Sequence, residues 1–226
     1  MKTIFPHIAS EISSIVIPPF LKGVRGILIL LVILSSCQPP DYLSQKELQN
    51  YIQDTSNGLS DEQEAGSLTM KVSYRPNDFL IWQEAEGKEL ADINEIGERY
   101  GDYAYFVLQL KAGKKDALYG TSASQAEFNN KLQTLSFRMN QFVNMTTSEK
   151  DTIPVADFYY TRMFGLSKTS DILFVFNKEK ISAADEVAFN IKEFGFNTGS
   201  RSFRFDTEKL NRSPKLLELK SYYETH

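Results

Sequence analysis

The sequence has few of the side chains that most often perform chemistry. Its 226 residues include one cysteine, Cys37, and two histidines, His7 and His226, which lie near the two ends. A single cysteine excludes a disulfide framework. Because the body of the chain has no imidazole, the sequence also excludes Ser–His–Asp and Cys–His catalysis and the usual zinc sites. Glycine-rich phosphate loops are absent as well. We therefore expect no metal and no cofactor.

The N-terminal region contains one short apolar run. Residues 27–34 are all Ile, Leu or Val, and Lys22 and Arg25 precede them. As a helix, eight residues would span ~12 Å, far less than the ~30 Å hydrocarbon layer. A positive segment followed by a short apolar one is typical of a signal peptide rather than a membrane-spanning helix.

The residues after this run are Leu34-Ser35-Ser36-Cys37. This tetrapeptide resembles the lipobox of bacterial lipoproteins. The resemblance implies cleavage between Ser36 and Cys37, followed by attachment of diacylglycerol, with palmitate among its acyl chains, to the Cys37 sulfur. Several acyl chains on one residue anchor a protein durably, whereas one chain is marginal. In some bacterial lipoproteins an Asp directly after the lipidated cysteine retains the protein in the inner membrane. Gln38 stands at that position here, so the resemblance implies the outer membrane.

The segment before the apolar run is long for a signal peptide. It extends over residues 1–26 and includes Glu11 and a Pro18-Pro19 pair. We therefore hypothesise that translation begins at Leu21 or Val24. The codons at those positions would test this hypothesis, since TTG and GTG are alternative start codons.

The mature chain is acidic. Removing residues 1–36 leaves 190 residues (226 − 36), with 22 Lys and Arg (25 − 3) against 28 Asp and Glu (29 − 1), for a net charge of −6. Nucleic-acid binding needs a basic surface, so we expect no nucleic-acid partner. The predicted organisation is a signal peptide at 1–36, a lipidated Cys and tether at 37–43, and one globular domain at 44–226.

Local patterns predict most of the elements. Two capping boxes begin helices at 45–54 and about 125–143. Shorter helices are predicted at 78–86 and 92–100, and Asp206 caps a last turn. Alternating and aromatic-rich segments predict strands. The predicted strands are 67–75, 103–111, 154–164, 171–178, 186–195 and 201–206.

These elements predict a single α+β domain. We expect a mostly antiparallel sheet of about six strands with the 125–143 helix packed on one face. A β-sandwich with decorating helices is the alternative. The acidic cluster at residues 61–64 is interpreted as a loop.

Candidate sites are few. Tyr159, Tyr160 and Arg162 form a candidate contact patch, because Tyr and Arg are enriched in binding hot spots. The alternative is that these tyrosines pack beneath loops or the long helix. Glu84 and Glu86 flank the single tryptophan, Trp82, but nothing in their spacing selects a catalytic pair.

Two functions follow from these observations. The first is a noncatalytic, lipid-anchored cell-envelope protein that binds a protein or envelope component through its β-rich face. The second is a carboxylate-dependent hydrolase that acts on glycan or peptidoglycan, which would need two acidic groups in contrasting environments.

Overall fold

The computed structural model describes residues 39–85, 89–163 and 167–225. Residues 39–225 belong to one compact unit. The predicted signal peptide and Cys37 lie outside the described residues. Among the described residues, no helix is both long enough and apolar enough to cross a membrane.

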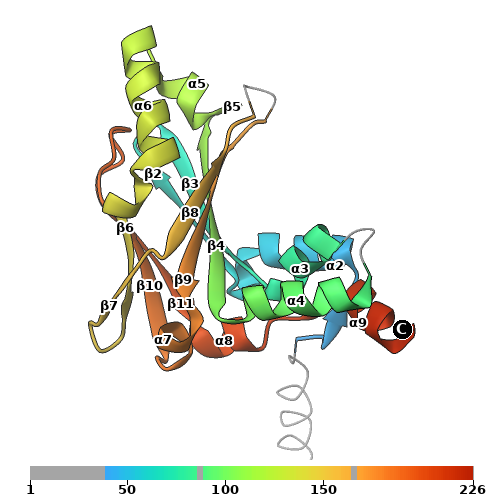
Figure 1. The fold of residues 1–226 in the computed structure, drawn as a ribbon. Helices are drawn as coiled ribbons and strands as arrows, with labels where there is room; N and C mark the ends of the chain where they lie inside the picture. The colour runs from blue at the N-terminus through green and yellow to red at the C-terminus, as the bar shows by residue number, and fades with distance from the viewer. Residues whose placement is uncertain (1–38, 86–88, 164–166, 226) are drawn as a thin grey trace, which may run out of the picture. The chain divides into compact units, whose positions relative to one another are not determined.

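The longest strands form a six-stranded antiparallel sheet, which we call the large sheet (Figure 1). Its strands are β2 (Ser60–Ala65), β3 (Leu68–Arg75), β4 (Tyr103–Ala112), β5 (Lys115–Asp116), β8 (Asp157–Thr161) and β9 (Ser170–Asn177). The order is β2-β3-β4-β9-β8, and β5 pairs with β4. β4 is therefore central, and β8 is an edge strand.

A second, four-stranded antiparallel sheet, the small sheet, packs against one face of the large sheet. Its strands are β6 (Val143–Thr147), β7 (Thr152–Pro154), β10 (Glu186–Ile191) and β11 (Arg201–Asp206), in the order β11-β10-β6-β7. Aromatic side chains fill the space between the sheets. The Phe106 and Phe205 ring centroids are 5.3 Å apart, and those of Phe174 and Phe189 are 5.4 Å apart.

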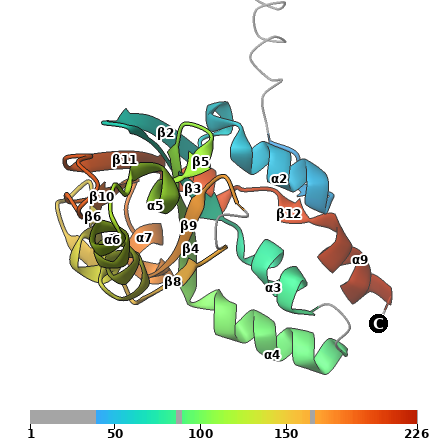
Figure 2. The ribbon, with the colours of Figure 1, turned by 90° about the horizontal axis from the view of Figure 1, so that it is seen from above.

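The opposite face of the large sheet, which we call the outer face, carries helices (Figure 2). These are α2 (Gln45–Gln53), α3 (Asn77–Ala85), α4 (Leu90–Gly101) and, beyond them, α9 (Leu217–Thr225). A short parallel pair, β1 (Tyr42–Leu43) and β12 (Lys215–Leu216), joins the start of the chain to its end. Residues 42 and 43, expected in the tether, are therefore part of the fold.

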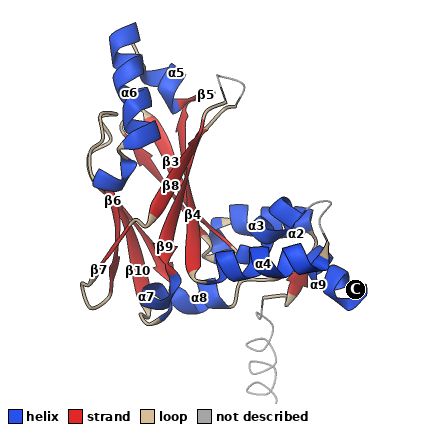
Figure 3. Cartoon of the chain, viewed as in Figure 1, coloured by secondary structure: helices blue, strands red, loops and turns tan. Residues whose placement is uncertain are grey.

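The remaining helices lie at the two ends of the sheets, and all but α6 are short (Figure 3). They are α5 (Ala117–Thr121), α6 (Gln125–Phe137), α7 (Lys178–Ser182) and α8 (Thr207–Asn211), with the 3₁₀ turns η1 (Thr55–Asn57) and η2 (Met139–Gln141). As predicted, Asp206 caps α8, since its carboxylate accepts a hydrogen bond from the Glu208 backbone N–H at 2.9 Å.

The α+β prediction is confirmed, and two details of it are wrong. The helix predicted to reach residue 143 and to pack on one face of the sheet ends at Phe137 and lies at one end of the sheets, because the chain from Val143 extends to pair with β10. The predicted strands 186–195 and 201–206 belong to the small sheet, so the packing of the two sheets is that of the alternative, a sandwich with helices.

The interpretation of the acidic cluster at residues 61–64 as a loop is also wrong, because this segment forms strand β2. Its residues pair with β3 throughout, from Ser60 opposite Ser73 to Ala65 opposite Leu68. β2 is an edge strand, and charged side chains are common on edge strands because they discourage pairing with other chains.

Candidate functional site: a groove on the outer face of the large sheet

A groove of about 420 Å³ lies between the outer face and helices α2 and α3; we call it the sheet groove. This volume is within the usual range of ligand pockets. Five residues of the large sheet and five of the two helices line it: Arg75, Val107, Thr161, Asp171, Leu173, Gln45, Gln49, Phe79, Leu80 and Gln83.

Strand alternation explains which side chains reach the groove. Along β3, Met70, Val72 and Tyr74 are buried between the sheets, so Arg75 at the strand end projects to the outer face. Along β9, Ile172 and Phe174 are likewise buried, and their neighbours Asp171 and Leu173 project outward. Two charged residues that are distant in sequence are thereby brought to one groove.

Arg75 is the basic side chain that lines the groove. It is half-buried, and its guanidinium carbon lies 5.5 Å from the centroid of the Phe79 ring, a cation–π geometry. Within the described part of the chain, its guanidinium has no hydrogen-bond acceptor and no ion-pair partner. Burial lowers the pKa of Arg75 from its ordinary value, and the charge of Asp171 opposes this effect. The fold therefore holds a partly desolvated cation without satisfying its donors.

Asp171 is the acidic side chain that lines the same groove. Its Oδ2 accepts a hydrogen bond of 3.1 Å from the Gln109 side chain. Its Oδ1 is buried and has no hydrogen-bond partner among the described residues. Because this oxygen is inaccessible, Asp171 acts on the groove through its charge, which favours the charged form of Arg75.

The rest of the lining is apolar or carries neutral amides. Val107 and Leu173 form the wall contributed by the sheet, and Phe79 and Leu80 form the opposite wall. The glutamines at positions 45, 49 and 83 each offer both donors and an acceptor. The arrangement suits binding of a partly apolar ligand with one anionic group, and it presents no nucleophile beside a base.

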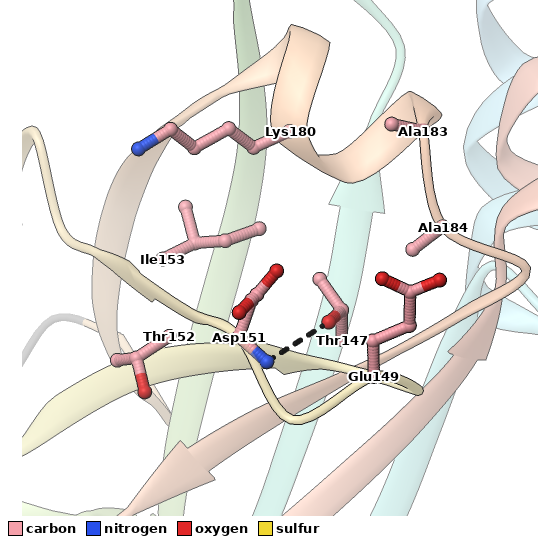
Figure 4. Close-up of a pocket in the computed structure, with 8 residues that line it drawn as sticks. All are labelled: Thr147, Glu149, Asp151, Thr152, Ile153, Lys180, Ala183 and Ala184. Carbon is pink, nitrogen blue, oxygen red and sulfur yellow. Dashed lines mark hydrogen bonds between the residues drawn. The ribbon is translucent and has the colours of Figure 1, made fainter.

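A second pocket, of about 390 Å³, lies between the β6–β7 hairpin and α7 (Figure 4). Glu149 and Asp151 of the hairpin and Lys180 of α7 contribute its charged groups. The Asp151 backbone N–H donates to the Thr147 hydroxyl at 3.1 Å, which closes the hairpin turn. Both acidic side chains are exposed to solvent.

The predicted contact patch is divided between the two faces of β8. Tyr159 is 67% exposed on the outer face, beside Leu173 of the groove. Tyr160 and Arg162 lie together on the other face, where Arg162 stacks over Phe128 at 5.8 Å. Burial raises the pKa of Tyr160. Arg162 lines a third pocket, of about 510 Å³, with residues of α5 and α6. The three residues do not form one surface.

The remaining sequence candidates give no catalytic arrangement. Cys37 and Ser36 of the lipobox, and Glu86, lie outside the described residues. Glu84 pairs with Arg99 at 2.7 Å and accepts a hydrogen bond from Tyr100 at 2.9 Å, so it connects α3 to α4. Among the described residues, no group of three or more His, Cys, Asp or Glu side chains could hold a metal ion.

Sequence reasoning missed the two central residues of the groove. Both carried a signal, since Arg75 ends an alternating strand and Asp171 begins an apolar one. A charged residue at the end of an otherwise buried strand indicates either a partner or a site, although Lys71 shares the outer side of β3 with Arg75. The pairing of these strands with β4, with Arg75 opposite Tyr105 and Asp171 opposite Gln109, brings both residues to one groove, and that pairing is not a local property.

Comparison with known proteins gives no family. The chain matches no known protein family, and no curated protein matches it. Among solved structures, it is similar to a crystal structure of a protein of unknown function from Burkholderia pseudomallei K96243, with a TM-score of 0.36 and 8% identity over 79% of this chain and 97% of that one. At that TM-score the similarity carries no argument about function.

Proposed function

We propose that this chain is a noncatalytic lipoprotein of the bacterial cell envelope, anchored through lipid on Cys37, that binds a protein or envelope component in the sheet groove. The environment of Arg75 supports the binding proposal. Its partly desolvated guanidinium faces an open groove and has no acceptor among the described residues. Desolvating a charge costs free energy unless a partner compensates for it.

The lipid anchor is inferred from the lipobox, and the outer membrane from Gln38. β1 begins at Tyr42, five steps along the chain from Cys37 (42 − 37), and an extended chain covers at most about 3.6 Å per residue. A lipid on Cys37 would therefore hold the folded domain within roughly 20 Å of the membrane surface. A partner of this domain would belong to the same membrane or to the space next to it.

Site-specific photo-crosslinking in cells tests the binding proposal. A photoreactive residue replaces Gln83 on the groove wall or, separately, Tyr159 beside it, and the control replaces Arg204, an exposed residue of the small sheet. We expect the two groove positions to capture the same partner and the control position not to capture it. Equal capture from all three positions would contradict a site in the groove.

The hydrolase alternative rests on the pocket in Figure 4, where Glu149 and Asp151 would be the acidic pair. Glycosidases need one carboxyl group held protonated by an apolar setting beside an ionised one. Here both side chains are exposed, so we favour binding. Hydrolysis of peptidoglycan by the wild type that is lost in both Glu149→Gln and Asp151→Asn would reverse this preference.

A further inference from the structure

The sheet groove has a distinct charge pattern. Arg75 presents a planar guanidinium whose donors have no acceptor among the described residues, and Asp171 lines the same groove and interacts with Arg75 through its charge. A guanidinium pairs best with a planar carboxylate, because two parallel N–H groups meet two oxygens. The nearby charge of Asp171 disfavours a ligand that carries more than one negative charge. The groove is therefore suited to a single carboxylate rather than to a phosphate dianion.

The surroundings of Arg75 have the chemistry of a peptide site. Gln45 and Gln49 from α2 and Gln83 from α3 can each both donate to and accept from a peptide group. The apolar walls can take the side chain next to the carboxylate. Thr161 brings the groove to β8, the last strand of the large sheet, and no described strand pairs with the outer edge of β8. Free edges of this kind can bind extended chains.

We infer that the sheet groove binds the carboxyl-terminal end of an extended peptide, with the terminal carboxylate on the Arg75 guanidinium. This inference rests on the proposed binding function and specifies its ligand class. The walls and glutamines position the last residues of the peptide, and the charge of Asp171 selects against multiply charged groups.

The test uses the full lipidated mature protein in detergent. The probe is a library of N-acetylated tetrapeptides, randomised at the last two positions and prepared in two forms, with a free carboxylate and with a carboxamide. Equilibrium dialysis with mass spectrometry selects the peptides that bind, and calorimetry gives their affinities. We expect carboxylate peptides to bind and the matching carboxamides to bind at least about 10-fold more weakly, because a charge-assisted hydrogen-bonded pair is lost.

Variants assign the effect to Arg75. Arg75→Gln should weaken binding about 10- to 100-fold, and Arg75→Lys should weaken it less, because it keeps the charge but loses the two-pronged geometry. Arg204→Gln is the matched control, since it removes an exposed guanidinium from the small sheet and should leave affinity within about 2-fold. Unchanged near-ultraviolet circular dichroism shows that each variant is folded.

Two results would overturn the inference: equal binding of carboxylate and carboxamide peptides, or an equal loss of affinity in Arg75→Gln and Arg204→Gln. Absence of binding by every peptide would also reject it. In that case crosslinking from Gln83 separates the two proposals. A partner captured in cells leaves the binding function standing with another ligand class, whereas no capture rejects both.

Discussion

Replacing Arg75 with methionine should leave the stability of the fold nearly unchanged. The substitution removes no hydrogen bond or ion pair within the described residues, and it keeps most of the apolar stem in place. It loses the cation–π contact with Phe79, which is worth about 0.5–1 kcal/mol. The lowered pKa of Arg75 shows that desolvation outweighs the attraction of Asp171, so removing the charge gives back some free energy. We expect the free energy of unfolding to change by less than about 1 kcal/mol.

Lys131 is the matched comparison, because it is also a buried cation but its donors are satisfied. It is 4% exposed, and its ammonium donates to the Thr121 carbonyl at 2.9 Å, the Thr121 hydroxyl at 3.0 Å and Glu127. The two hydrogen bonds to Thr121 are worth about 1.5–3 kcal/mol each, since the donor is charged. Lys131→Met should therefore lower the free energy of unfolding by about 3–6 kcal/mol.

Urea denaturation of the mature chain carrying Cys37→Ser, followed by circular dichroism, measures both variants against the same background. The expected result is a midpoint near that of the parent for Arg75→Met and a clearly lower midpoint for Lys131→Met. If Arg75→Met loses as much stability as Lys131→Met, Arg75 has a structural role, and the argument that its unsatisfied donors mark a ligand site fails.

Three further predictions concern the fold that supports the groove. Phe189→Ala should lower the free energy of unfolding, measured by urea denaturation, by about 3–5 kcal/mol, because Phe189 is fully buried and contacts the Phe106 and Phe174 rings of the large sheet. A decrease of less than about 1 kcal/mol would contradict the packing of the two sheets. Asp206→Ala should lose about 1 kcal/mol through loss of the α8 cap, and Asp206→Asn, which can still cap, should lose less. Glu193→Gln should lose about 1–3 kcal/mol at pH 7, because the carboxylate accepts four backbone hydrogen bonds of 2.7–2.9 Å in the loop that follows β10. Burial raises the pKa of Glu193, but those bonds more than offset it and lower the pKa overall. This stabilisation should therefore be present above the unfolded pKa of about 4.3 and be lost as the pH falls through the folded pKa. The parent and Glu193→Gln should then converge in stability at acid pH, and a difference that stays constant with pH would contradict this.

The elements that the sequence predicts well are those with local causes. The capping box at Ser44 and Glu47 correctly predicts that α2 begins at Gln45. The Glu47 carboxylate accepts hydrogen bonds from the Ser44 backbone N–H at 3.1 Å and from the Ser44 hydroxyl at 2.6 Å. The second box correctly begins α6, with Ser124 accepting from the Glu127 backbone N–H at 3.2 Å. Helix starts depend on a few neighbouring residues, and these are visible in the sequence.

The elements that the sequence predicts poorly depend on distant partners. The apolar stripe after Leu135 fits a helix as far as residue 143, yet Val143 and Met145 pair with β10 instead. The same long-range pairing divides the strands between two sheets. It also brings Arg75 and Asp171 to one groove. Of the candidate contact patch, Tyr159 borders the groove, and the groove itself could not be predicted from any one segment.

Lipid attachment at Cys37 is the central claim, because the proposed location and the proposed partner both depend on it. The most direct measurement is incorporation of radiolabelled palmitate into the wild type and Cys37→Ala, with fractionation of the membranes. We expect label in the wild type alone and sedimentation of the wild type with the outer membrane. Absence of label from the wild type, or equal label in Cys37→Ala, would contradict it.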